Sequence, residues 1–90
     1  MYSKQTTVLN KLGLHARPAS EFVLLARKFK SDVFIQNLDD GSAPTNAKSI
    51  NNILAGNFAE GANVKVVAEG DDEIVAADKL VALIDSGFGE

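Results

Sequence analysis

The sequence predicts a two-layer α/β sandwich, in which helices pack their apolar faces against one β-sheet. Segments with strand-like and helix-like spacing of apolar residues follow one another in the order strand, helix, strand, strand, helix, strand, helix. The chain has 90 residues and contains no repeat, linker or low-complexity stretch. Residues 1–90 are therefore expected to form a single domain.

The first third of the chain is expected to form a strand, a loop and a long helix. Residues 2–9 are polar and β-prone, and residues 11–15 form a loop around Gly13. Pro18 suits the first turn of the helix, where the N–H that proline lacks would have no partner. The helix is expected to bury a stripe of apolar residues at Ala19, Phe22, Val23, Ala26 and Phe29.

Two strands and a short helix are expected next. Residues 32–38 alternate between polar and apolar side chains and lead into an Asp-Asp-Gly turn. Residues 43–48 predict a short strand, which Pro44 confines to a sheet edge or a strand start because proline cannot donate a ladder hydrogen bond. Ser49 can cap a short helix that ends near Gly56.

The last third predicts a strand and a helix. Residues 63–69 alternate regularly, so one face of that strand is expected to be buried. The final helix begins after Gly70, carries acidic residues in its first turn and ends just before Gly87. Its buried stripe is predicted at Ile74, Ala77, Val81 and Ile84.

The composition is that of an ordinary globular protein, with 46% hydrophobic and 23% charged residues. The absence of cysteine excludes a disulfide scaffold and a thiolate metal site. No apolar run approaches the roughly 20 residues that a membrane span needs, and residues 1–9 have no apolar signal-peptide core. We therefore expect a cytoplasmic protein that does not insert into membranes.

Charge is distributed unevenly along the chain. Residues 1–30 carry six Lys and Arg against a single Glu, whereas residues 31–90 carry three Lys against eleven acidic residues. This split indicates either a basic face for an anionic or acidic partner, or charges scattered over a solvated surface. Nucleic acid is a poor candidate partner, because the net charge is −3 and no basic run is interleaved with aromatic residues.

His15 is the only histidine, and it lies just before the start of the first helix, two residues ahead of Arg17. A helix N-terminus gathers unpaired N–H groups and a partial positive charge, so it favours anions and a neutral imidazole. Neutral imidazole can act as a nucleophile, and the guanidinium of Arg17 could then hold the phosphoryl oxygens. On chemistry alone, however, a single histidine before a helix is more often a solvated loop residue or a cap.

Other chemistry at His15 finds less support in the residues. A single histidine with no cysteine and no carboxylate at ligand spacing cannot supply a local metal site, so neither a metal nor a cofactor is expected. A hydrolase is disfavoured because Ser20 is expected on a helix, without the glycines of a nucleophile elbow.

Ser49 and the residues after it have both structural and functional interpretations. Ser49 is by default a helix cap, but a phosphate there would be stabilised by the helix N-terminus and could be regulatory. Ile50, Leu54 and Phe58 recur at near-helical spacing, so most of them are expected in the core. One or two of them, with Ile50 and Leu54 as the candidates, could instead form an exposed patch that docks a partner.

Residues 11–20, KLGLHARPAS, form a motif around His15 that runs from the loop into the first helix. This motif closely resembles the active site of the HPr family, the histidine-containing phosphocarrier proteins of the phosphotransferase system. Residues 48–50, KSI, resemble its second signature, around a regulatory serine. The turn and strand at 60–66 and the helix entry at 69–73 also resemble the family, so the similarity spans nearly the whole chain.

The resemblance implies an open-faced sandwich, with a four-stranded antiparallel sheet and three helices on one face. It implies that Nδ1 of His15 accepts a phosphoryl group from phosphorylated enzyme I and passes it to enzyme II A-type domains. Arg17 and the backbone N–H groups around Ala16 and Arg17 would bind that group. Ser49 would correspond to the serine modified by HPr kinase/phosphorylase, and a shuttle of this kind is expected to be a monomer.

The sequence leaves both the pathway and the function with an alternative. Residues 10–13 and 86–88 resemble the nitrogen-related branch of the family, NPr, more than the sugar-transport branch. A different function is also consistent with the sequence, namely a regulatory docking module that is controlled by phosphorylation of Ser49 and in which His15 is vestigial.

Overall fold

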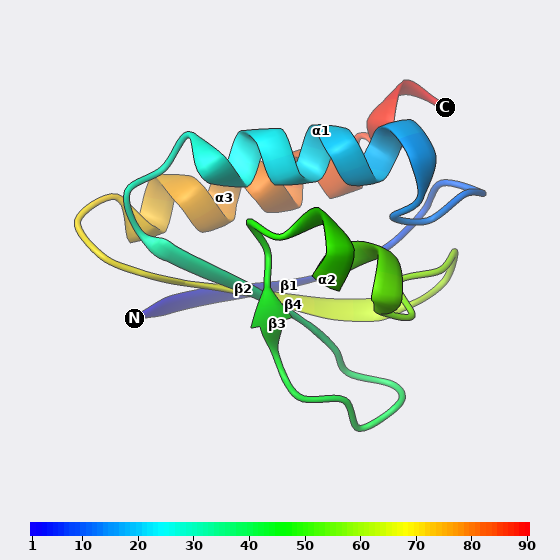
Figure 1. Ribbon diagram of the computed structural model, residues 1–90, viewed down its shortest axis with the longest axis horizontal. Helices are drawn as coiled ribbons and strands as arrows, with labels where there is room; N and C mark the ends of the chain where they lie inside the picture. The colour runs from blue at the N-terminus through cyan, green and yellow to red at the C-terminus, as the bar shows by residue number, and fades with distance from the viewer.

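A four-stranded antiparallel sheet forms one layer of the molecule in the computed structural model, which describes residues 1–90 (Figure 1). Its strands are β1 (Tyr2–Thr7), β2 (Asp32–Asn37), β3 (Thr45–Asn46) and β4 (Asn63–Glu69). They lie in the order β1-β4-β2-β3, and each neighbouring pair is antiparallel. β1 and β4 therefore pair although their sequences are far apart.

Three helices form the second layer: α1 (Ala16–Arg27), α2 (Ile50–Ala55) and α3 (Glu73–Asp85). α1 and α3 lie side by side over one face of the sheet, and the shorter α2 lies near β3 (Figure 1). A single 3₁₀ turn, η1 (Gly87–Gly89), follows α3. The open-faced sandwich expected from the resemblance is thus confirmed, and no helix is long and apolar enough to cross a membrane.

The core lies between the two layers and follows the predicted periodicities. Alternate residues of β2 and β4 are buried, as their strand patterns predict. On α1, the predicted stripe is buried at Ala19, Phe22, Val23 and Ala26. Phe29 lies beyond the end of the helix and is only partly buried against this core. Each large apolar side chain that is fully buried contributes about 1.5–3 kcal/mol, so this stripe fixes α1 on the sheet.

The predicted stripe of α3 is wrong at its first residue. Ile74 is 58% exposed, whereas Ala77, Val81 and Ile84 are buried as expected. Ile74 occupies the first turn of the helix, and the buried face of α3 also includes Ala76 and Leu80. The spacing from Ile74 to Ala77 is compatible with a 3.6-residue period, so spacing alone did not show that the buried face begins at Ala76.

The two predicted strand segments at the sheet edges are shorter than expected. β1 ends at Thr7 rather than at residue 9, because Val8 instead exchanges backbone bonds with the turn before β4. β3 covers only Thr45–Asn46 of the predicted residues 43–48. Its edge position is as predicted, and Pro44 precedes it, where the missing N–H removes no ladder bond.

Asp72 joins the turn after α1 to the start of α3. Its carboxylate accepts the backbone N–H groups of Lys30 and Ser31, each at 2.9 Å, and the hydroxyl of Ser31. The Ser31 hydroxyl, followed by the Lys30 N–H, lowers the pKa of Asp72 to about 2. The ionised carboxylate therefore ties together the ends of two helices that cover the sheet.

Candidate functional site

His15 is the N-cap residue of α1 and is exposed to solvent. Its backbone is extended, with φ −132° and ψ 161°, and its side chain makes no capping hydrogen bond. The first backbone N–H groups of a helix have no intrahelical partners, so those of Ala16 and Arg17 lie at a position that favours an anion. The imidazole therefore makes no capping contact and lies beside an electropositive helix end.

The loop before His15 is held by a buried turn. The N–H of Gly13 donates to the carbonyl of Asn10 at 3.2 Å, and Nδ2 of Asn10 donates back to the carbonyl of Gly13 at 2.9 Å. The N–H of Leu14 donates to the carbonyl of Phe58 at 2.8 Å, and the Leu14 side chain is fully buried. These contacts anchor the residue immediately before His15 in the core.

Only glycine fits at position 13. Its φ is +63°, and a Cβ there would lie 2.3 Å from the carbonyl oxygen of Phe58 and 2.8 Å from Cα of Ala59. Both the backbone conformation and the close approach therefore exclude a side chain. The same close approach is what allows the hydrogen bond from Leu14 to Phe58.

Ala16 also has a left-handed backbone, with φ +53°, although it is not glycine. Such a conformation costs about 1–2 kcal/mol for an L-residue and persists only where its surroundings impose it. Here the fixed loop precedes it, and the buried Pro18 follows within the first turn of the helix. The strain thus lies at the junction between His15 and α1.

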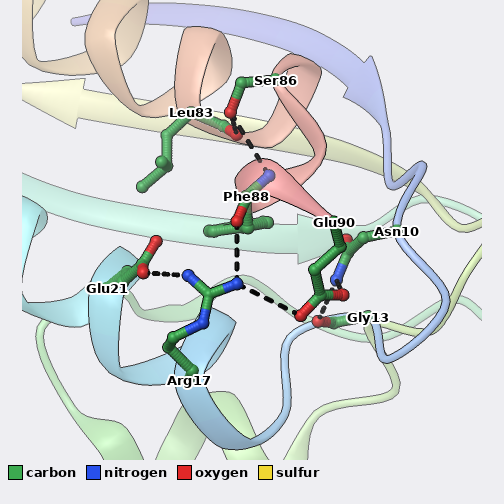
Figure 2. Close-up of polar contacts among 8 residues, drawn as sticks. All are labelled: Asn10, Gly13, Arg17, Glu21, Leu83, Ser86, Phe88 and Glu90. Atoms are coloured by element: carbon green, nitrogen blue, oxygen red, sulfur yellow. Dashed lines mark hydrogen bonds and ion pairs between the residues drawn. The ribbon is translucent and has the colours of Figure 1, made fainter.

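Arg17 contacts a residue of α1 and two residues that follow α3 (Figure 2). Nη1 pairs with the carboxylate of Glu21, one turn further along α1. Nη2 donates to the carbonyl of Phe88 at 2.9 Å and lies 3.5 Å from the carboxylate of Glu90. The Arg17 side chain as a whole is half exposed.

Ser49 is the N-cap residue of α2, as predicted. Its hydroxyl oxygen accepts the N–H of Asn52 at 3.3 Å, and its side chain is half-buried. Close by, Arg27 donates through Nε to the carbonyl of Lys48 at 2.9 Å, which links α1 to the start of α2. The structural interpretation of Ser49 is thus realised, and the hydroxyl also lies where a phosphate would meet a helix N-terminus.

The two candidate docking residues on α2 lie in different environments. Ile50 is partly buried and lines a shallow groove of about 240 Å³ between α1 and α2, together with Ser20, Val23, Leu24 and Arg27. Leu54 is 44% exposed and lies outside that groove. Phe58 is buried in the core. Of the three apolar residues, Ile50 and Leu54 are available for a partner.

The basic residues of the first third do not gather at His15. Arg17 and Arg27 lie at opposite ends of α1, about 15 Å apart at the helical rise of 1.5 Å per residue. Lys28 follows at the C-terminal end, where cations complement the helix dipole. The basic face suggested by the sequence is therefore divided, with one part beside His15 and another beside Ser49.

Sequence reasoning missed several residues that shape this site. Leu24 is 60% exposed and lines the groove beside Ile50; its signal was a large apolar residue off the buried stripe of α1. The contacts of Arg17 with Phe88 and Glu90 join residues that are more than 70 positions apart, so no local pattern indicates them. No group of three or more His, Asp or Glu side chains is arranged to hold a metal ion.

The protein is a small α+β domain that presents one histidine at a helix start. This combination is typical of the class of histidine-containing phosphocarrier domains. The family model described as "PTS HPr component phosphorylation site" matches residues 2–86 of this chain. The crystal structure of HPr-C-His from Thermoanaerobacter tengcongensis is similar, with a TM-score of 0.92 and 44% identity, covering 100% of this chain and 98% of that one. The chain belongs to the HPr family.

The relatives within this family differ in kind. The phosphocarrier protein HPr of Cupriavidus necator is 38% identical over 90 residues, which cover 100% of this chain and 98% of that protein. The HPr-like protein Crh of Halalkalibacterium halodurans is 40% identical over 85 residues, 94% of this chain and 98% of that one. A multiphosphoryl transfer protein of Haemophilus influenzae is 39% identical over 83 residues, 92% of this chain, but the chain spans only 17% of its length.

Proposed function

We propose that this protein carries a phosphoryl group on His15 between partner proteins of the phosphoenolpyruvate-dependent phosphotransferase system. The observation that carries the proposal is the exposed, uncapped imidazole of His15 at the N-terminus of α1, within a chain that matches the HPr phosphorylation site over residues 2–86. Phosphorylated enzyme I is the donor, and enzyme II A-type domains are the acceptors.

The transfer needs few groups from this chain. Nδ1 of neutral His15 supplies a lone pair to phosphorus, the bond from phosphorus to the donor nitrogen breaks, and the donor keeps that electron pair. The backbone N–H groups of Ala16 and Arg17 and the guanidinium of Arg17 would bind the phosphoryl oxygens. The reverse step on an acceptor protein regenerates the free imidazole.

The groove between α1 and α2 is the proposed docking surface for these partners. It combines apolar side chains of Leu24 and Ile50 with the cation of Arg27, and it adjoins the capping serine, Ser49. Leu54 extends the exposed apolar surface of α2. A phosphate on Ser49, added by an HPr kinase/phosphorylase, would bring about two negative charges to this surface and alter docking.

A second candidate function is a regulatory docking module, because the chain is also 37% identical to Crh of Bacillus subtilis, which is described as a catabolite repression HPr. In that case partner binding depends on the groove and on Ser49, and not on His15. Partner binding that persists in His15→Ala but changes in Ser49→Asp would identify this function. The resemblance of residues 10–13 and 86–88 to the nitrogen-related branch leaves the sugar and nitrogen branches as alternatives for the phosphocarrier.

The test of the proposal is incubation with phosphoenolpyruvate and enzyme I, followed by intact-mass analysis. The wild type is expected to gain one phosphate that mild acid removes, and His15→Ala is expected to gain none. Ser49→Ala serves as the control and should be labelled like the wild type. The proposal fails if neither the sugar-branch nor the nitrogen-branch enzyme I adds phosphate to the wild type.

A further inference from the structure

Residues 10–13 form a β-turn that exposes its two central side chains. The N–H of Gly13 donates to the carbonyl of Asn10 at 3.2 Å, and this hydrogen bond closes the turn. Lys11 and Leu12 are the central residues, and both are exposed, with Leu12 at 52%. A cation and a large apolar side chain therefore form the tip of the turn, just before His15 in the chain.

The turn is held in place on both sides. Before it, Val8 is buried and exchanges backbone hydrogen bonds of 2.8 and 2.9 Å with residues 61–62. After it, Leu14 is fully buried. Within it, Nδ2 of the buried Asn10 donates to the carbonyl of Gly13 at 2.9 Å (Figure 2). The tip is thus presented on a rigid support, so a partner that binds it loses little affinity to the ordering of the loop.

The position of the tip places it within reach of any phosphoryl donor. A protein that transfers a phosphoryl group to His15 must bring its own reactive atom next to the imidazole. Consecutive Cα atoms are about 3.8 Å apart, so Cα of Leu12 lies at most about 11 Å from Cα of His15. A protein–protein interface of standard size buries about 800 Å² on each partner, which corresponds to a patch about 16 Å in radius. A patch of that size centred on His15 includes Leu12.

We propose that the tip of this turn is a contact for the phosphoryl donor, enzyme I, in which Leu12 enters an apolar depression of the donor and Lys11 faces carboxylates beside it. The inference deepens the proposed function and rests on it. Interfaces combine an apolar centre with a polar rim, and the two side chains supply one of each. The contact with the donor then includes residues before His15 as well as the groove between α1 and α2.

Steady-state kinetics of phosphorylation by enzyme I, with this protein as the varied substrate, test the role of Leu12. Leu12→Ala is expected to raise KM about threefold to tenfold, because about half of the leucine surface remains to be buried by the donor. The kcat value should stay unchanged, since the contact is the same before and during transfer. Leu12→Met keeps an apolar side chain of similar volume and should restore KM to within about twofold of the wild-type value.

Ile74 provides the matched control for an exposed apolar side chain. It is 58% exposed and lies in the first turn of α3, which begins at the opposite end of the helical layer from the start of α1 (Figure 1). Ile74→Ala should therefore leave KM unchanged. The melting temperature of Leu12→Ala should equal that of the wild type, because the Leu12 side chain is not part of the core.

Salt separates the contribution of Lys11 from that of Leu12. Lys11→Gln should raise KM about twofold to fivefold at low ionic strength, the range for loss of one exposed ion pair. Most of this effect should disappear at about 0.5 M NaCl, where exposed charges are screened, whereas the effect of Leu12→Ala should be the same at both salt concentrations.

Three results overturn the inference. They are a wild-type KM in Leu12→Ala, an equal rise of KM in Ile74→Ala, and a fall of kcat in Leu12→Ala without a change in KM, which would mean that the tip acts on the imidazole and not on the donor. In each of them the wild type is still phosphorylated. They are therefore distinguishable from failure of the proposed function, in which the wild type takes up no phosphoryl group from either enzyme I and the inference fails with it.

Discussion

Gly13→Ala is the substitution that most sharply probes the scaffold of the His15 loop. The new methyl group would lie 2.3 Å from the carbonyl oxygen of Phe58, which is the acceptor for the N–H of Leu14. The obstruction is backbone and cannot rotate away. The loop must therefore move, and the hydrogen bond from Leu14 to Phe58 is lost.

The expected cost has two parts. A non-glycine residue at φ +63° costs about 1–2 kcal/mol, and the loss of a buried backbone hydrogen bond costs about 1 kcal/mol more. Gly13→Ala should therefore lower the free energy of unfolding by about 2–3 kcal/mol. Gly41 is the matched control, because its φ is +72° and nothing lies within 4 Å of the Cβ that alanine would add. Gly41→Ala should show only the conformational part.

Urea denaturation of the wild type and both variants measures the two costs. The difference between Gly13→Ala and Gly41→Ala isolates the contact with Phe58 and should be about 1 kcal/mol or more. The initial rate of phosphorylation by enzyme I should fall in Gly13→Ala and stay at the wild-type value in Gly41→Ala. Equal destabilisation by both substitutions would refute the view that packing against Phe58 positions the loop.

Substitutions at three other positions test separate features. The pKa of Asp72 is about 2 in the folded protein and about 3.8 in an unfolded chain, so the contribution of its carboxylate to stability is complete above pH 4 and is lost as the pH falls towards 2. Asp72→Asn should therefore lower the melting temperature at pH 7 and make the melting temperature decline less steeply between pH 4 and pH 2. A decline parallel to that of the wild type would contradict the lowered pKa. Ser49→Ala should lower the free energy of unfolding by about 1 kcal/mol, because the hydrogen bond from the N–H of Asn52 is lost. Ser49→Asp retains a capping oxygen and should lower the free energy of unfolding by less. Urea denaturation measures both changes. Ala16→Gly should leave the unfolding free energy unchanged or raise it, because glycine adopts φ +53° freely; a loss of about 1 kcal/mol, as in an ordinary helix, would show that the strain is absent.

The layered fold could be predicted because its signals are local and mutually consistent. Apolar spacing marked the buried face of α1 and alternation marked β4, so the order of elements followed, and Pro44 indicated the edge position of β3. The errors fall where local spacing is ambiguous. Ile74 fits the helical period but lies in the first turn of α3 and is exposed, and the residues flanking Thr45–Asn46 form no ladder pairs.

The candidate site was predictable in part, and its surroundings were not. His15 and Ser49 stand out because each directly precedes a helix, and the N-terminus of a helix favours capping side chains and anions. The environment of Arg17 depends on Phe88 and Glu90, which only the folded chain brings beside it. The left-handed conformation of Ala16 is likewise imposed by the surrounding structure, since alanine gives no sign of it.

The central claim is that a phosphoryl group both enters and leaves this protein through His15. The most direct test isolates the phosphorylated protein, mixes it with an unphosphorylated enzyme II A-type domain, and follows both intact masses. We expect this protein to lose one phosphate while the acceptor gains one, in equal amounts and without free phosphate. Phosphate that stays on this protein, or that appears only as free inorganic phosphate, would contradict the carrier role.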